Sequence, residues 1–348
     1  MKYTALSLGT GLALLMATPA TADKFHCRSS DRTSPYPVEM TGLHDHLRYA
    51  PATTGLDVRE FAAYTAVFDG DDDDNRDGIP DLTANPTFVA YHLRGVRPDA
   101  SGVYREPDVS IERPGDWYRA PDLDFLWTNR PSVSDDRIDN SYDGIGRTWN
   151  RGHLAMADHA QRISAEASCN THFFWNASPQ AAEFNQGPWL HLETYSAAVS
   201  NSAGEAWIMA GPIFDAGREI LYIGDNGEVP VAVPHAFFKI IVVETRWGIQ
   251  TRSFIYEHPS SLAANGNPGP DEPSDDSWVK CSSASNGRHD YNHADNLVSI
   301  AEIEQRTGLR FMPNVTDRDA LIAAEHDDLW SIPAEFWTGF ICGGQREA

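Results

Sequence analysis

A short segment in the middle of the chain carries residue types that suit chemistry on a phosphate group. Asn150, Arg151 and His153 surround a single glycine. A histidine beside a glycine turn can act as a general base near neutral pH. An adjacent arginine can bind a phosphate through two parallel hydrogen bonds. The segment therefore predicts acid–base chemistry on a phosphate-containing substrate.

A second segment, about thirty residues further on, adds a candidate metal ligand. Asn185 offers an amide oxygen, a hard ligand that suits Mg²⁺, an ion that keeps most of its waters. Residues 184–198 have a helical period, which would place Asn185, Trp189 and Glu193 on one stripe. The helical rise from Asn185 to Glu193 is about 12 Å. We therefore expect Glu193 to reach the metal through water.

Together these segments resemble the signature of the DNA/RNA non-specific endonucleases, whose active site is a ββα-metal (His-Me) finger. That signature runs Asp-Arg-Gly-His, then Asn-x-[Ser/Thr]-Pro-Gln, then Asn-x-Gly-x-Trp-x-x-Leu-Glu. Residues 150–153, 176–180 and 185–193 match it in the same order. Flanking similarities extend the resemblance over roughly residues 86–311.

The resemblance implies a role for each matched residue. His153 would be the general base that activates water, and Arg151 would stabilise charge in the transition state. Asn185 would be the only direct protein ligand of Mg²⁺, with Glu193 holding the water shell of the metal. The remaining residues would order the site or bind substrate: Asn150, Asn176 and Gln180.

One of the matched positions departs from the family signature. Asn150 stands where the family usually has Asp, so one charge beside the site is lost. The family also has an upstream arginine four residues before an aromatic residue. Arg113, ahead of Trp117, fits that spacing, and Arg119 is the second candidate.

An acidic segment at residues 69–81 predicts a second metal site. It has the spacing Asp-x-Asx-x-Asp-Gly-x-x-Asp, which is found in calcium-binding repeats. Residue 84 is alanine, so the bidentate glutamate of a complete EF-hand is missing. A solvated acidic loop without a cation is the alternative. The expected calcium ligands are Asp73, Asn75, Asp77, the carbonyl of Ile79, and Asp81.

The negative net charge of the chain, taken alone, argues against a nucleic-acid substrate. Fifty acidic residues against twenty-seven lysines and arginines give a formal net charge of −23. Such a surface repels polyanions at long range, although a local arginine cluster can overcome the repulsion. A saline medium, in which charges are screened, would make this acidity harmless.

The N-terminal residues predict export from the cell. Lys2 precedes an apolar stretch over residues 6–16, and Ala20-Thr-Ala22 resembles a cleavage site. We expect a signal peptide over residues 1–22, a single nuclease domain over residues 23–348, and a secreted or periplasmic location. Beyond the first twenty residues no apolar run reaches membrane-spanning length, so we expect no membrane partner.

The four cysteines suit an oxidising compartment and, taken alone, allow three pairings. The resemblance implies one bridge from before a C-terminal helix to the C-terminus. That implication selects Cys281–Cys342 and leaves Cys27–Cys169.

The elements that must position these residues follow no regular alternation of strand and helix. Helical periods occur at 184–198 and 298–307. This pattern favours an α+β fold over a doubly wound sheet, and the resemblance implies a mixed antiparallel sheet carrying the ββα-metal finger. Strand-like runs occur at residues 64–68, 88–91, 172–175, 206–209 and 236–243.

Two functions of different classes are compatible with these observations. The first is a secreted, Mg²⁺-dependent endonuclease that hydrolyses phosphodiester bonds of DNA and RNA. The alternative is a catalytically inactive, calcium-stabilised, secreted binding module on the same fold, for which the acidic surface is the strongest argument.

Overall fold

The structure is a computed structural model, and it describes most of the chain between residues 24 and 338. The described residues are 24–27, 44–69, 83–107, 109, 111–115, 117–118, 137–145, 148–258, 280–281 and 291–338. The predicted signal peptide and the acidic segment that would bind calcium, apart from its first residue, lie outside them.

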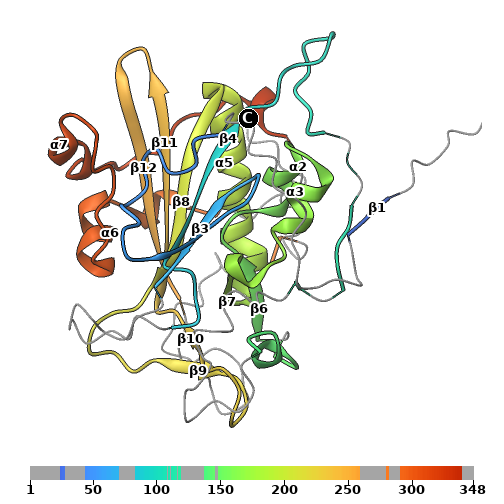
Figure 1. The fold of residues 1–348 in the computed structure, drawn as a ribbon. Coiled ribbons are helices and arrows are strands. Elements are labelled where there is room, and N and C mark those ends of the chain that lie inside the picture. Colours follow the sequence, from blue (N-terminus) through green and yellow to red (C-terminus); the bar gives the residue numbers. More distant parts are fainter. Residues whose placement is uncertain are drawn as a thin grey trace, which may run out of the picture.

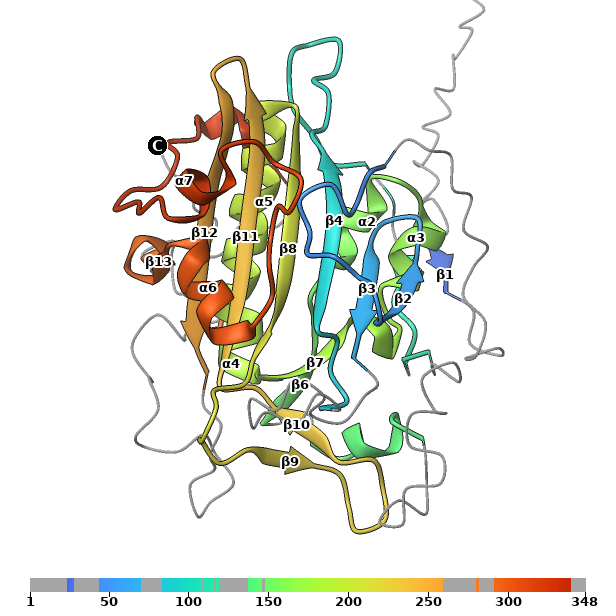
Figure 2. The same ribbon diagram turned by 60° about the vertical axis from the view of Figure 1, so that its left-hand side comes forward.

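An antiparallel sheet forms the centre of the described structure (Figures 1 and 2). All six neighbouring pairs of its seven strands run antiparallel, so the predicted α+β class with an antiparallel sheet is confirmed. In spatial order the strands are β13 (Leu297–Val298), β12 (Gly248–Glu257), β11 (Ala236–Thr245), β8 (Glu205–Ile213), β4 (Phe88–Arg94), β3 (Thr65–Phe68) and β2 (Asp57–Glu60).

Helices cover both faces of the sheet, and strand β11 shows why. Successive side chains of a strand point to opposite faces. Phe237 and Ile241 belong to the core beside helix α5 (Leu190–Ala203). Phe238 and Ile240 belong to a second core beside α6 (Ile300–Thr307) and α7 (Arg318–Ile322), on the opposite face (Figure 2). A strand that is apolar on both faces therefore needs a layer on each side.

Smaller elements surround this sheet. The ribbon of β6 (Trp149–His153) and β7 (Ala177–Ala181) lies near one end of it (Figure 2). Strands β9 (Leu221–Ile223) and β10 (Val231–Val233) form a second antiparallel ribbon, and β1 (Phe25–His26) pairs in parallel with β5 (Ile111–Glu112). Two short helices, α2 (Ala157–Gln161) and α3 (Ala165–Asn170), connect β6 to β7. No helix among the described residues is long and apolar enough to span a bilayer.

Two predicted elements differ from the structure. Residues 172–175 were predicted to form a strand, but they form a turn that enters the 3₁₀ helix η2 (Phe174–Asn176). Their aromatic side chains are buried among loops and helix ends, and Phe173 pairs with Tyr118 in an isolated bridge outside any strand. Apolar character there therefore reflects burial and does not mark a strand. The predicted continuous helix over residues 184–198 is interrupted, as described below.

Cys27 and Cys169 form the expected disulfide, which joins residues 142 positions apart. Cys281 is also disulfide-bonded. Its expected partner, Cys342, lies outside the described residues, so the pairing Cys281–Cys342 stays a prediction.

We expect loss of the Cys27–Cys169 bridge to destabilise the fold without abolishing it. A cross-link that closes a long loop removes conformational entropy from the unfolded chain, and the typical contribution is about 2–4 kcal/mol. Urea unfolding of Cys27→Ser/Cys169→Ser should therefore show a lower midpoint than the wild type. An unchanged midpoint for a variant that is otherwise native would contradict this prediction.

Acid should weaken the fold through its buried histidines. Burial lowers the pKa of His46 to about 4, of His172 to about 4 and of His258 to about 3. An unfolded chain titrates its histidines near pH 6.5. Between these values the unfolded state binds more protons than the folded state, so stability is lost as pH falls from about 6.5 towards about 4.

Differential scanning calorimetry across this pH range should show the melting temperature falling steadily. High salt in every buffer suppresses the opposing effect, which is the relief of repulsion among acidic groups. A melting temperature that stays constant from pH 6.5 to 4.5 would show that these histidines do not control acid stability.

Candidate active site

The candidate site is built on the β6–β7 ribbon and the helical segment that follows it. The antiparallel register pairs Asn150 with Gln180 and His153 with Ala177. Gly152 is required by close approach, since a Cβ at this position would lie 2.3 Å from the Cδ atom of Gln180. The glycine between the arginine and the histidine thus leaves room for the Gln180 side chain, which lies across it from the neighbouring strand.

Asn150 links this ribbon to the helical segment. Its Oδ1 accepts a hydrogen bond from Nδ2 of Asn185 at 3.1 Å and another from Nε2 of Gln186 at 2.8 Å. Because the amide nitrogen of Asn185 is held by Asn150, its amide oxygen is the end left for a metal ion. An asparagine at position 150 therefore keeps the acceptor that an aspartate would supply, without the charge.

His153 lies at the end of β6 in an aromatic enclosure. Its ring centroid is 4.5 Å from that of Trp117 and 4.8 Å from that of His172. Nε2 is buried and has no hydrogen-bond partner, whereas the residue as a whole is partly exposed, so water can reach the Nδ1 side. Burial, with smaller contributions from His172 and Arg113, holds the pKa of His153 well below its usual value. The ring is therefore neutral and able to accept a proton.

The two candidate site arginines that the structure describes, Arg113 and Arg151, differ in exposure. The Arg113 side chain is 65% exposed, and its guanidinium lies 3.7 Å from the carboxylate of Asp158. Its charge also lowers the pKa of His153, which places it within electrostatic range of that ring. Arg151 is more enclosed, contacts Asp143 at 3.4 Å, and has a buried Nε without a partner. Arg119, the second candidate, lies outside the described residues.

The expected single helix carrying Asn185 and Glu193 is not continuous. Short helix α4 (Ala182–Phe184) leads into a π-helical turn, η3 (Asn185–Trp189), before α5 begins. Gly187 has non-helical torsion angles and Pro188 cannot donate a backbone hydrogen bond, so the regular ladder cannot pass through them. The predicted i, i+4, i+8 stripe is therefore wrong for this segment.

Glu193 is buried, and its carboxylate is paired with a lysine. It is 4% exposed, and its Oε1 lies 3.8 Å from Nζ of Lys239, which is fully buried on β11. Burial raises the pKa of Glu193 to about 7 and lowers the pKa of Lys239 to about 8. Neither Oε1 nor Nζ has a hydrogen-bond partner. The pair is held by charge alone and is sensitive to any third polar group.

Lys239 links Glu193 to His153 through one tryptophan. Its ammonium lies 4.1 Å from the ring centroid of Trp189, and Nε1 of Trp189 donates a hydrogen bond to the carbonyl of His153 at 3.1 Å. Our sequence analysis assigned no role to Lys239. The available signal was a lysine within the apolar strand run 236–243, because such a charge is rarely buried without a partner.

The two remaining predicted residues are fully buried. Asn176 ties the segment after β6 to the turn before β7, since its amide bonds both backbone groups of Ala155 and the carbonyl of Thr171. Gln180 packs against Gly152, and both polar atoms of its side chain lack a partner. Asn176 orders the backbone that follows His153, whereas the amide of Gln180 makes no hydrogen bond beside the ribbon.

These residues fit a magnesium ion bound mainly through water. The amide oxygen of Asn185 is a hard ligand, and Oε1 of Glu193, although ion-paired with Lys239, makes no hydrogen bond. Among the described residues there is no group of three or more His, Cys, Asp or Glu side chains that could hold a metal ion. The predicted calcium ligands, residues 73–81, lie outside the described part of the chain.

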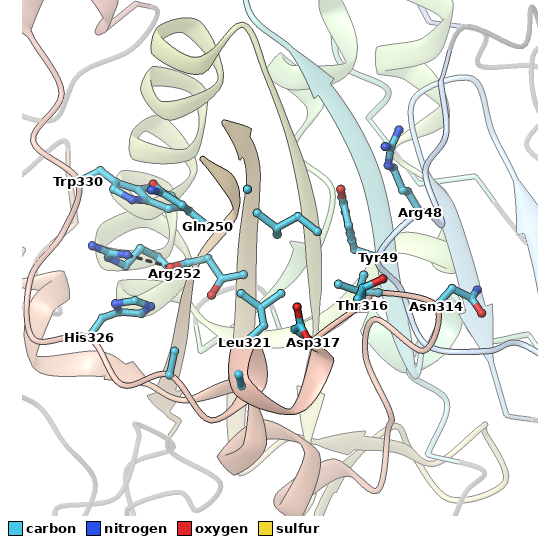
Figure 3. A pocket seen from close by; sticks show the side chains of 16 residues that line it. Arg48, Tyr49, Gln250, Arg252, Asn314, Thr316, Asp317, Leu321, His326 and Trp330 are labelled. Carbon is cyan, nitrogen blue, oxygen red and sulfur yellow. Dashed lines mark hydrogen bonds between the residues drawn. The ribbon is translucent and has the colours of Figure 1, made fainter. Parts of the chain in front are cut away.

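A separate groove of about 1150 Å³ lies beside the β11–β12 hairpin and contains none of the predicted site residues. Trp330, Arg252 and His326 gather at one end of it (Figure 3). The Arg252 guanidinium lies 4.8 Å from the Trp330 ring centroid and donates to the backbone and carboxylate of Asp328. This arginine therefore fastens the C-terminal segment to the sheet.

A two-stranded ribbon with the histidine at the end of its first strand, followed by a helical segment carrying Asn185, defines a ββα-metal finger. Residues 52–318 match the family described as DNA/RNA non-specific endonuclease. Because the match covers more than half of the chain, this protein belongs to that family.

Individual relatives agree with this assignment. Mitochondrial endonuclease G of Bos taurus is 29% identical over 188 residues, covering 52% of this chain and 54% of the relative. A nuclease of Nostoc sp. is 28% identical over 176 residues, covering 50% and 54%. The chain thus spans about half the length of these curated relatives. A crystal structure of EndoG with EndoGI, described as showing the mechanism of EndoG inhibition, aligns with a TM-score of 0.47 at 20% identity, over 75% of this chain and 87% of that chain.

Proposed function

We propose that this protein is a secreted, Mg²⁺-dependent endonuclease that hydrolyses phosphodiester bonds of DNA and RNA, with His153 as the general base. The state of His153 carries this proposal. It is a neutral imidazole with one buried and one water-facing nitrogen, placed at the tip of the family motif. A base that removes a proton from water needs this state.

The other residues have complementary tasks in this proposal. Nδ1 of His153 would take the proton of the attacking water, and Asn185 would hold the metal through its amide oxygen. Bound Mg²⁺ would supply positive charge for the phosphate oxygens. Arg113, which is largely exposed, would bind the phosphate as it arrives, while Arg151 would stabilise charge closer to the base. Glu193, with the ammonium of Lys239 beside it at 3.8 Å, would carry negative charge beside the water shell.

A gel assay tests the proposal. Plasmid DNA and ribosomal RNA are incubated with the protein in Mg²⁺ and, separately, in a chelator. We expect both substrates to be cut in Mg²⁺ and neither in the chelator. Binding without cleavage in both conditions would instead support the alternative, an inactive module on the same fold.

Export is supported by the disulfide between Cys27 and Cys169, because such bridges persist in oxidising compartments. N-terminal sequencing of protein recovered outside the cytoplasm should begin at Asp23 if the predicted cleavage site is used. A mature protein that retains residues 1–22 would contradict this part of the proposal.

Salt should affect the activity in two opposing ways. Added salt weakens protein–nucleic acid contacts by reducing the gain from counterion release. It also screens the repulsion between a protein of net charge −23 and a polyanion. We therefore expect initial rates on plasmid DNA to rise or stay level from low to moderate NaCl and to fall only later. A steady decline from the lowest concentration would show that the arginines near the site dominate.

A further inference from the structure

Lys239 is a charged residue in the interior of the protein. It lies on β11, between the neighbouring strands β8 and β12, and it is 0% exposed. Because side chains alternate along a strand, Lys239 shares a face with Phe237 and Ile241, which belong to the core beside α5. A lysine is almost never fully buried unless it is paired. The groups around this ammonium therefore indicate what the residue does.

The ammonium of Lys239 contacts a carboxylate and an aromatic ring. Nζ lies 3.8 Å from Oε1 of Glu193 and 4.1 Å from the ring centroid of Trp189, and it has no hydrogen-bond partner among the described residues. Replacing a buried ion pair by apolar residues of similar volume is often neutral or stabilising. The stability of the fold therefore does not explain why a lysine stands at this position.

The ring of Trp189 fixes the position of this ammonium relative to His153. Trp189 is 0% exposed, and its ring centroid lies 5.5 Å from that of Phe184 and 5.7 Å from that of Phe237. Its Nε1 donates a hydrogen bond to the carbonyl of His153 at 3.1 Å. A cation over the face of an aromatic ring is attracted by that ring. The packed indole therefore holds the charge of Lys239 at a fixed place relative to the backbone of His153.

The same charge acts on the carboxylate of Glu193. Burial raises the pKa of Glu193 to about 7, and the charge of Lys239 is the largest effect that opposes this rise. Arg113 opposes it less, and Asp158 adds to it. Burial favours the neutral form of a carboxyl group, and a nearby positive charge favours the ionised form. Without Lys239, Glu193 would therefore lose negative charge.

We infer that Lys239 is a positioning residue that acts through Glu193: its ammonium, held against the Trp189 ring, keeps the Glu193 carboxylate charged and in place. This inference rests on the proposed function, in which Glu193 holds the water shell of Mg²⁺. Oε1 of Glu193 makes no hydrogen bond among the described residues, so it can still accept one from water. Lys239 is too deeply buried to touch a nucleic acid, so its effect on the reaction passes through its neighbours.

A double-mutant cycle on the full-length protein tests this inference. Lys239→Met removes the positive charge but keeps a long unbranched side chain, and Glu193→Gln removes the negative charge of its partner. We expect Lys239→Met to lower kcat on plasmid DNA at least about tenfold, the low end for loss of a group that supports a metal site, with KM for DNA unchanged. In the Glu193→Gln background the same substitution should change kcat by less than about threefold, because the group through which Lys239 acts is already neutral. Losses that multiply, or wild-type kcat in Lys239→Met, would overturn the inference.

Two measurements that do not depend on activity complete the test. Removing one partner of a buried ion pair leaves an uncompensated charge and is strongly destabilising. In metal-free protein we therefore expect Lys239→Met to lower the urea midpoint and Lys239→Met/Glu193→Gln to recover it. Calorimetric titration with Mg²⁺ should show an affinity about tenfold lower in Lys239→Met than in wild type. An unchanged Mg²⁺ affinity would overturn the inference, and if Lys239→Met does not fold, a kcat of the double variant at least about tenfold below that of Glu193→Gln would do so.

Lys24→Met is the matched control, because it removes the same charge from an exposed position just before β1. Its kcat, urea midpoint and Mg²⁺ affinity should match those of the wild type. Equal losses in Lys24→Met and Lys239→Met would show that net charge, and not the buried position, is responsible, which overturns the inference. Wild-type activity in Glu193→Gln would instead show that the proposed role of Glu193 is wrong. Multiplying losses together with an impaired Glu193→Gln remove the inference alone, so the two failures are distinguishable.

Discussion

His153→Ala should lower turnover on plasmid DNA by at least about 10²-fold, the lower range for loss of a general base. The histidine is partly exposed and its Nε2 has no hydrogen-bond partner among the described residues, so its removal costs the fold little beyond packing against Trp117 and His172. Binding of DNA, measured by fluorescence anisotropy in the presence of Mg²⁺, should stay within a few-fold of wild type because the arginines remain.

A matched control is His326→Ala. His326 is also a partly exposed histidine, but it lies in the groove beside the β11–β12 hairpin, away from the β6–β7 ribbon. Its removal should leave turnover unchanged. Turnover of His153→Ala within threefold of wild type would remove the base from the proposal.

Asn185→Ala should have a comparable effect through the metal. Its amide oxygen is the direct protein ligand in the proposed site, and the hydrogen bond to Asn150 holds that oxygen in place. Substitution of a residue that only supports a metal ligand typically lowers metal affinity or activity by about 10–100-fold. Loss of the ligand itself should therefore lower activity at subsaturating Mg²⁺ by at least about 10²-fold relative to wild type. Part of this loss should be recovered at high Mg²⁺, because the remaining ligands are water.

The adjacent amide provides the control for this variant. Gln186 donates to the same oxygen of Asn150 as Asn185 does, at 2.8 Å, so Gln186→Ala removes an equivalent hydrogen bond without removing the proposed ligand. Its Mg²⁺ titration curve should resemble that of the wild type. Identical shifts in the two titrations would indicate that these amides only support the ribbon and that the metal is bound elsewhere.

The relative positions of site residues that lie close together in the sequence could be predicted well. The ribbon, its glycine and the asparagine beyond it form one supersecondary unit, so their spacing in the sequence nearly determines their spacing in space. The strand runs at 64–68, 88–91, 206–209 and 236–243 were also predicted, since they combine β-branched and aromatic residues with burial.

The break at Gly187-Pro188 was missed although both residues are visible in the sequence. Apolar periodicity through Phe184, Trp189 and Leu192 resembles that of a continuous helix, since all three are buried. A π-helical turn changes the phase of the side chains by about one residue without removing their burial. Periodicity therefore detected the buried face and could not detect the added turn.

The sequence by itself determined which chemical groups the site holds and the order in which the chain presents them: a histidine, its neighbouring arginine and an asparagine amide within one local unit. Only the tertiary structure decided how those groups are tuned. Glu193 meets Lys239 because β11 runs beneath α5, and His153 meets His172 because the turn after α3 folds back onto β6. Such partners come from distant parts of the chain, and their effect on proton affinity depends on burial and on distances of a few ångströms. Those quantities exist only after the layers have packed, because desolvation of a charge requires a complete interior.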